Sequence, residues 1–227
     1  MGAVGLFVNG VSIYGISDGM SYGNQKVWLN AAPVFEQYDM DICTGHAAQG
    51  DYHHHHNPNC LSDRLGDNGT AHSPLYGWVM DGFPLYGPYS ATNTLAQSCW
   101  KKRDYNDPIV GCADGGRSCV LVDEFAASKG TTSASSSGPS LSGNITTQSG
   151  NSVPAVSGIY YQDYYYDSTC TAGGGLDRHN GHSHDGLSYH YHITMGSNGE
   201  PAFPYMMGPT YYGALPAGKR CASSISG

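Results

Sequence analysis

Charged side chains are scarce in this chain, and most of those present are acidic. Only 12% of the 227 residues are charged, and 10 Lys and Arg against 18 Asp and Glu give a formal net charge of −8. Nucleic-acid binding needs a basic patch, and the sequence shows none, so we expect no nucleic-acid partner. An apolar run of about 18 residues is also missing, and we therefore expect no membrane span.

The usual short cysteine motifs are missing as well. Neither C-x-x-C nor C-x-x-C-H occurs among the seven cysteines, which argues against a zinc ribbon, a thioredoxin-type site and c-type haem. Seven cysteines in an acidic chain rich in Gly and Tyr favour an oxidising compartment and a disulfide-braced fold. Because seven is odd, at least one thiol is free, bonded to another chain or a ligand. The disulfide candidates are Cys43, Cys60, Cys99, Cys112, Cys119, Cys170 and Cys221.

Other features bear on export. The first residues lack the charged start of a signal peptide, so we expect any leader to be absent from this sequence. Two sequons, Asn68-Gly-Thr and Asn144-Ile-Thr, agree with an exported glycoprotein that carries glycans. Together with the cysteines, they predict a secreted, extracellular or periplasmic protein.

Long amphipathic periodicity is absent, and the local patterns favour strands. Residues 4–15 predict two strands joined by a turn at Asn9-Gly10. Residues 157–168 alternate well enough to form a third strand, and a short helix is expected near 92–101. The prediction is a mainly β fold with little helix, arranged as a disulfide-braced β-sandwich or barrel-like structure.

Domain organisation follows from composition. Residues 127–158 are rich in Ser, Thr and Gly, which is typical of a loop insertion or linker. A length of 227 residues allows one all-β domain with a sizeable core or two small domains. We predict a single domain over residues 1–227 that carries this insertion.

The histidines are concentrated in two similar stretches, GHAAQGDYHHHH at 45–56 and GHSHDGLSYHYH at 181–192. Both fit the pattern D-x-[CH]-x-G-H-x-x-x-G followed by Tyr-His-x-His, although more than a hundred residues separate them. An affinity tag has no second copy in its own chain, so the repeat excludes that explanation. It predicts a pseudo-twofold internal repeat.

Strand geometry gives each Tyr-His-x-His segment a face that suits a metal ion. Same-face residues lie about 6.5–7 Å apart at Cα, so two imidazoles can converge, and a Gly-rich turn returns the Gly-His histidine to the same point. Three neutral imidazoles suit Zn²⁺ or Cu²⁺. The predicted metal ligands are His46, His53, His55, His182, His190 and His192.

Acidic and phenolic side chains accompany both histidine stretches. Asp41 and Asp177 are candidate acceptors for imidazole N–H groups, which would fix the tautomer of the ligands. Tyr52 and Tyr189 precede the histidine pairs. A metal-free interpretation stays open, because His, Tyr and Asp can also form a hydrogen-bonded network that specifies a fold.

Four segments resemble the YHYH-domain family, which is named for the tetrapeptide at 189–192. They are residues 45–61, 72–89, 189–192 and 203–213. The resemblance covers nearly the whole chain outside the Ser-rich insertion, and it implies an exported protein. His72 and Asp81 also fit the family pattern. They either contribute to the site or form a polar pair within a turn.

The sequence departs from the family pattern at two positions. His54 replaces a Tyr, so the first tetrapeptide reads Tyr-His-His-His. His179 stands where the resemblance implies a Cys that matches Cys43, and it could add a ligand near the second site. Cys43 and Cys60 flank the first histidine cluster and are candidates for a bridge that braces it.

Three functions are consistent with these patterns. The first is a secreted metal-binding protein that holds copper or zinc in two sites or in one shared site. The second is a structural subunit of an extracellular fibre or coat, because exposed strand edges and an odd cysteine permit self-assembly into an oligomer or filament. The third is a histidine-metal hydrolase or oxidase. Only Asp51 and Asp185 lie inside the motifs as carboxylates, and no nucleophile motif is evident, which argues against an enzyme.

Overall fold

A computed structural model describes residues 2–147, 149–184 and 186–215. Asp185 and the disulfide candidate Cys221 lie outside these ranges. The chain divides into two compact units. Unit 1 comprises the residues up to Ile16, Asp39–Ser98 and the residues from Gly173 onwards, and unit 2 comprises Ser17–Tyr38 and Cys99–Ala172. The extent of the predicted single domain stays a prediction.

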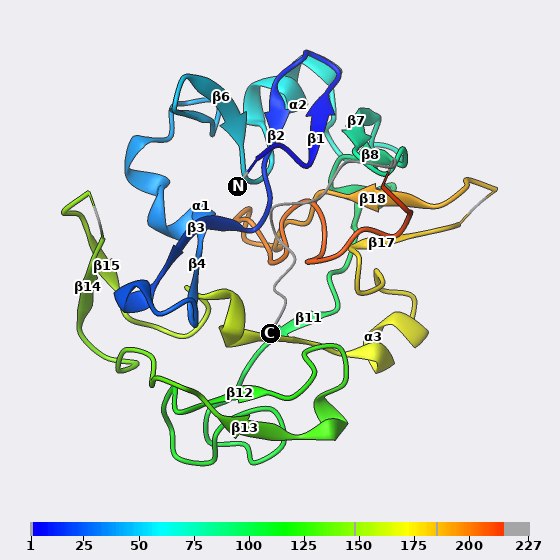
Figure 1. Cartoon of the computed structure of the whole chain (residues 1–227). Coiled ribbons are helices and arrows are strands. Elements are labelled where there is room, and N and C mark those ends of the chain that lie inside the picture. Colours follow the sequence, from blue (N-terminus) through cyan, green and yellow to red (C-terminus); the bar gives the residue numbers. More distant parts are fainter. Residues whose placement is uncertain (1, 148, 185, 216–227) are drawn as a thin grey trace. The chain divides into compact units, whose positions relative to one another are not determined.

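Unit 1 contains one mixed eight-stranded sheet, most of whose strands are labelled in Figure 1. In spatial order they are β17 (Gly181–His182), β18 (His190–His192), β8 (Pro84–Tyr86), β7 (Leu75–Val79), β1 (Gly5–Phe7), β2 (Ser12–Ile13), β6 (Asp51–His54) and β5 (His46–Ala48). The pairs β18–β8 and β2–β6 are parallel, and all other neighbours are antiparallel. The pairing pattern reads the same from both ends. We name β1-β2-β6-β5 half A and β7-β8-β18-β17 half B.

A pseudo-twofold axis relates the two halves and passes between β1 and β7. Leu6 pairs with Trp78 at its centre, and equivalent pairs flank it on either side. Residues 5–15 and 77–87 share the motif G-x-x-x-[ND]-G-x-x-x-Y-G, so the internal repeat is wider than the histidine stretches. The β1–β7 pairing requires glycine at two positions, because a Cβ on Gly5 or Gly77 would lie 2.5 or 2.4 Å from a backbone oxygen of the opposite strand.

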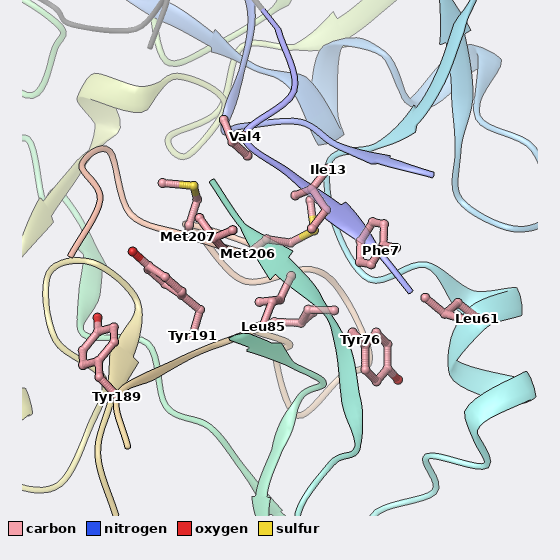
Figure 2. Close-up of a cluster of buried hydrophobic side chains, with 12 residues drawn as sticks. Val4, Phe7, Ile13, Leu61, Tyr76, Leu85, Tyr189, Tyr191, Met206 and Met207 are labelled. Atoms are coloured by element: carbon pink, nitrogen blue, oxygen red, sulfur yellow. The ribbon is translucent and has the colours of Figure 1, made fainter. Parts of the chain in front are cut away.

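One face of the sheet packs into an apolar core (Figure 2). Ile13, Leu85 and Tyr191 are fully buried in it. Burial of a side chain of this size contributes roughly 1.5–3 kcal/mol, so this face anchors both halves. On the other face, Leu6 and Trp78 are 53% and 52% exposed. The predicted hairpin at 4–15 is confirmed as β1 and β2.

The remaining described elements are short. The paired strands outside the large sheet are β3 (Ser17–Ser21) with β4 (Leu29–Ala31), β9 (Tyr89–Ala91) with β10 (Thr94–Leu95), β11 (Trp100–Lys102) with β16 (Tyr164–Tyr166), β12 (Cys119–Leu121) with β13 (Thr131–Ser133), and β14 (Asn144–Thr146) with β15 (Ser152–Pro154). The helices are α1 (Ala32–Phe35), α2 (Asn59–Leu65) and α3 (Ser168–Ala172), with 3₁₀ turns η1 (Tyr22–Asn24), η2 (Gln37–Asp39), η3 (Ala127–Lys129) and η4 (Tyr161–Asp163). The prediction of a mainly β fold with little helix is confirmed.

Local predictions in and near unit 2 need correction. The helix expected near 92–101 is wrong, because β10 and the start of β11 occupy that stretch. Residues 127–158 are not a plain loop, since η3, β13, β14 and β15 lie within them. The stretch 157–168 is a strand only at β16. Before it, the Asp163 carboxylate accepts hydrogen bonds from the backbone N–H groups of Gly158, Ile159 and Tyr160, which folds the chain into η4.

A buried ion pair stabilises unit 2. The Arg117 guanidinium donates to the Asp163 carboxylate at 2.8 and 3.0 Å, and both side chains are inaccessible to solvent. The Tyr105 hydroxyl also donates to Asp163. A fully hydrogen-bonded buried pair of this kind is costly to break, because the surviving charge would be left without a partner.

Three disulfides lie within the described ranges, as a disulfide-braced fold predicts. Cys43–Cys60 belongs to unit 1 and confirms the candidate bridge beside the first histidine stretch. Cys99–Cys170 and Cys112–Cys119 belong to unit 2. None of the helices in these ranges has the length and apolar character that a bilayer crossing requires.

Candidate metal centres

Half B gathers five histidines beside β18. His190 and His192 flank Tyr191 on this strand, so their side chains lie on the face opposite the one that enters the core. His182 on β17 pairs directly with His190. His72 precedes β7 and His184 follows β17. Ring centroids of contacting pairs in this set lie 4.3–6.4 Å apart. The rings of the predicted trio are therefore brought together with those of His72 and His184. The described set whose ligand atoms converge comprises His72, His184, His190 and His192, and the predicted ligand His182 is not part of it.

Hydrogen bonds determine which imidazole nitrogen carries the lone pair. Nδ1 of His190 lies 2.8 Å from the Ser188 carbonyl oxygen, and Nδ1 of His192 lies 2.6 Å from that of Gly87. Nδ1 of His72 lies 2.8 Å from the Ser73 carbonyl oxygen. A carbonyl oxygen only accepts, so in each ring Nδ1 carries the proton and Nε2 carries the lone pair.

These lone pairs meet in one small space. The Nε2 atoms of His72, His190 and His192 are buried and have no hydrogen-bond partner among the described residues. One ligand atom of each of these residues, and one of His184, lies within 4.8 Å of all the others. Nitrogens bound to a tetrahedral Zn²⁺ at about 2.0–2.1 Å are about 3.3 Å apart. The cluster can therefore close on one ion with small side-chain movements.

The β18 imidazoles are neutral at neutral pH. Burial lowers the pKa of His192 well below its ordinary value of 6.5, and the neighbouring imidazoles shift it in the same direction. Burial also lowers the pKa of His190. Because a metal ion binds the unprotonated ring, both residues are in the ligating form at pH 7.

Half A repeats this arrangement with three histidines. His46 on β5 pairs with His53 on β6, and one ligand atom of each of His46, His53 and His55 lies within 4.8 Å of the others. Nδ1 of His53 lies 2.9 Å from the Asp51 carbonyl oxygen, and Nδ1 of His55 lies 2.7 Å from that of Gly15. The two Nε2 atoms, which face each other at 3.1 Å, are thus the lone-pair nitrogens. That spacing is close to the value of about 3.3 Å for two ligands of one tetrahedral ion.

Sequence comparison places these clusters in a family. The profile described as YHYH protein matches residues 1–116, which is more than half of the chain. The chain belongs to the YHYH protein family. The matched residues contain all of half A together with β7 and β8 of half B. No curated protein and no solved structure matches the chain.

The two predicted carboxylates of the YHYH repeat organise turns. Asp41 accepts the Tyr52 hydroxyl at 2.7 Å and two backbone N–H groups of the turn before β5. Asp177 accepts the Tyr189 hydroxyl at 3.0 Å and the equivalent N–H groups before β17. Burial and the Asp41 hydrogen bond raise the pKa of Tyr52 to about 12, so its hydroxyl stays protonated as a donor.

A different carboxylate contacts a cluster imidazole. Asp39 Oδ1 lies 3.0 Å from Nδ1 of His46 and so directs Nε2 of that ring toward His53 and His55. Sequence reasoning missed Asp39, because its separation of seven residues from His46 follows no motif. It also missed His184, although the spacing His182-x-His184 repeats the His-x-His pattern of the strand ligands.

The other candidates of the YHYH motifs lie outside the convergent sets. His179 Nδ1 lies 3.0 Å from the Thr210 carbonyl oxygen, and Asp81 accepts the Tyr191 hydroxyl at 2.6 Å. His54 takes the place of Tyr191 on the core side of half A, where its ring contacts Phe7. Of the pair His72 and Asp81, only His72 belongs to a histidine cluster.

Proposed function

We propose that this YHYH family member binds two metal ions, one at each histidine cluster of unit 1. Four strands, β8, β7, β1 and β2, separate β18 from β6 in the sheet. At about 4.8 Å per strand, the two clusters are roughly 24 Å apart. This separation favours two sites over one shared site on the pseudo-twofold axis.

The observation that carries the proposal is the set of buried Nε2 lone pairs on His72, His190 and His192. A buried acceptor without a partner costs about 1–3 kcal/mol, and three of them in one space add mutual repulsion. A cation bound to all three nitrogens removes both costs. A metal-free hydrogen-bonded network would need donors at this point, whereas His72, His190 and His192 each direct a lone pair to it.

The donor atoms favour copper or zinc. Imidazole nitrogen suits Zn²⁺ and Cu²⁺, whereas Mg²⁺ and Ca²⁺ prefer oxygen ligands. The three disulfides agree with an exported protein. Both sequon residues, Asn68 and Asn144, are exposed and accessible to a glycan. The fibre subunit and the metal-dependent hydrolase or oxidase stay predictions from the sequence.

The test is elemental mass spectrometry of protein purified without nickel and loaded with copper or zinc. Wild type should carry about two equivalents. His190→Ala with His192→Ala should lose one, His53→Ala with His55→Ala should lose the other, and His179→Ala is the control that keeps both. Circular dichroism checks that each variant is folded. Wild type without bound copper or zinc, or full loading of both double variants, would refute the proposal.

A further inference from the structure

A C-terminal segment covers the outer side of half B. Residues 208–213, which we name the strap, lie against the repeat histidine stretch and the β7–β8 turn. The Tyr212 ring stacks on the Tyr189 ring with 3.5 Å between centroids and 6° between planes. Phe83 meets both rings edge-on at 5.1 and 5.5 Å. Tyr189 is consequently only 7% exposed.

Two backbone hydrogen bonds set the position of the strap. Tyr212 N–H donates to the Tyr191 hydroxyl oxygen at 2.8 Å, and Gly213 N–H donates to Asp81 Oδ2 at 2.9 Å. A Cβ on Gly213 would lie 2.7 Å from the Phe83 ring, so the strap must have a glycine after its aromatic residue. The bound segment is thus an aromatic–glycine pair that uses one ring and two N–H groups.

Half A has the same surface without a strap among the described residues. Tyr52 is the counterpart of Tyr189, yet it is 37% exposed. Ile42, in the adjacent turn, is 91% exposed. Val11 takes the place of Phe83. We name Asn9, Val11, Ile42 and Tyr52 the Tyr52 surface.

We propose that the Tyr52 surface binds an aromatic–glycine segment of another polypeptide. Half B shows what this surface accepts, because its counterpart is covered by such a segment. The turn below the ring is also matched. Asn9 stands in the place of Asp81, and its Oδ1 accepts the Val11 N–H at 3.2 Å as Asp81 Oδ1 accepts the Phe83 N–H at 3.3 Å. The remaining Nδ2 of Asn9 is a donor, so it suits a backbone carbonyl of the bound segment.

The chemistry of the partner follows from these groups. One flat aromatic ring stacks on Tyr52, and the glycine that follows allows close approach of the backbone to Val11. The side chains of this surface are uncharged, so a neutral segment fits. The strap of half B is tethered and benefits from a high local concentration, whereas a free segment lacks this advantage and binds more weakly.

The test is an NMR titration of the full-length, metal-loaded chain with the peptide Gly-Pro-Thr-Tyr-Tyr-Gly-Ala, which copies residues 208–214. We expect saturable shifts around Tyr52 at millimolar peptide. Tyr52→Ala should weaken binding at least tenfold, and Tyr52→Phe, which keeps the ring, should change it less than about threefold. Val11→Phe, which copies Phe83, should tighten binding about two- to tenfold. A peptide with Ala at the Tyr212 position should not bind.

Two results would overturn the inference. One is an absence of shifts up to the solubility limit of the peptide. The other is a set of shifts confined to residues 179–191 that persists in Tyr52→Ala, because the peptide would then only be displacing the strap from half B. Metal content measured on the same samples reports on the proposed function separately, since neither Tyr52 nor Val11 is a predicted ligand.

Discussion

Half A and half B share strand order, sequence motif and carbonyl anchors, but they complete their clusters differently. In half B, His72 and His184 join the strand histidines from two separate loops. In half A, within the described ranges, the third histidine is His55 directly after β6, no histidine from a separate loop joins it, and Asp39 orients His46. The strands therefore determine where the first ligands lie, and the loops determine how many imidazoles an ion meets.

The turns that carry the Gly-His histidines differ in a related way. In half A the turn is fixed by the Cys43–Cys60 disulfide. In half B the equivalent position is His179, which is held near the Thr210 carbonyl oxygen of the strap by a hydrogen bond. The disulfide that fixes the turn in half A thus corresponds to the strap that lies against the turn in half B.

The largest expected difference between the halves is in the loss of stability when the glycine before each Gly-His histidine is replaced. A Cβ on Gly181 would lie 2.4 Å from the Tyr189 hydroxyl oxygen and 2.6 Å from the His190 backbone oxygen. The three atoms nearest to a Cβ on Gly45 all belong to side chains, the closest being the Tyr52 hydroxyl oxygen at 2.4 Å. We expect Gly181→Ala to lower the free energy of unfolding by about 3 kcal/mol and Gly45→Ala by about 1–2 kcal/mol. Urea denaturation of both variants checks this order, and equal losses would contradict it.

Removal of the half A bridge should act on one cluster only. Cys43→Ser with Cys60→Ser opens a disulfide that spans 17 residues. We expect a loss of about 2–3 kcal/mol in stability, because the unfolded chain gains freedom. Metal should be lost from half A and kept in half B. Thermal denaturation with elemental analysis measures both effects, and the matched control is the same double variant at Cys112 and Cys119 in unit 2.

The residues unique to each cluster should affect only their own ion. His72→Ala removes an imidazole from half B, and we expect its metal affinity to fall about 10- to 100-fold, as for loss of a ligand or its support. Asp39→Asn weakens the orientation of His46 and should lower the affinity of half A by about tenfold. Competition with a chelator, followed for each site in the background of the other site's double variant, measures the two changes. A change that appears at both sites would contradict their independence.

The smallest expected effect is a loss of stability at acidic pH. Burial lowers the pKa of His190 and His192, so below about pH 6.5 these residues are protonated in the unfolded chain but remain neutral in the folded chain. The metal-free protein should therefore lose stability as the pH falls from 6.5 toward the folded pKa values, by at most about 1.4 kcal/mol per pH unit for each residue. Burial likewise lowers the pKa of His54.

His54→Tyr, which copies Tyr191 of half B, should flatten that pH profile by about one residue's share. At pH 7 it should leave stability nearly unchanged, because Tyr191 shows that a tyrosine fits the equivalent position. Urea denaturation of the metal-free variant between pH 7 and pH 5 measures the slope. A slope as steep as that of wild type would show that His54 is not a source of acid sensitivity.

The strand ligands and the hairpin were predictable because they depend on local periodicity. His190 and His192 share a face of β18 through alternation alone, whereas His55 lies in the bend directly after β6 and its Nε2 still meets that of His53 at 3.1 Å. The wider repeat at 5–15 and 77–87 could also have been recognised from its glycines. His72 was named as one of two alternatives, a site contributor or a turn residue, and only the structure distinguishes them. The roles of Asp39 and the strap were not predictable, since each depends on how a loop folds back onto the sheet. Asp41 and Asp177 were predicted to accept imidazole N–H groups. The structure instead gives them the turn N–H groups and the tyrosine hydroxyls as partners, which the sequence pattern does not indicate.

The seam between Leu6 and Trp78 has the geometry of an isologous dimer interface. A free half would expose β1 or β7 as an unpaired edge, and a second copy would be its natural complement. When both halves belong to one polypeptide, the β1–β7 pairing is kept but the two halves no longer need the same sequence. One half can then change its side chains while the other keeps its histidine ligands, which is impossible in a homodimer because both subunits have one sequence.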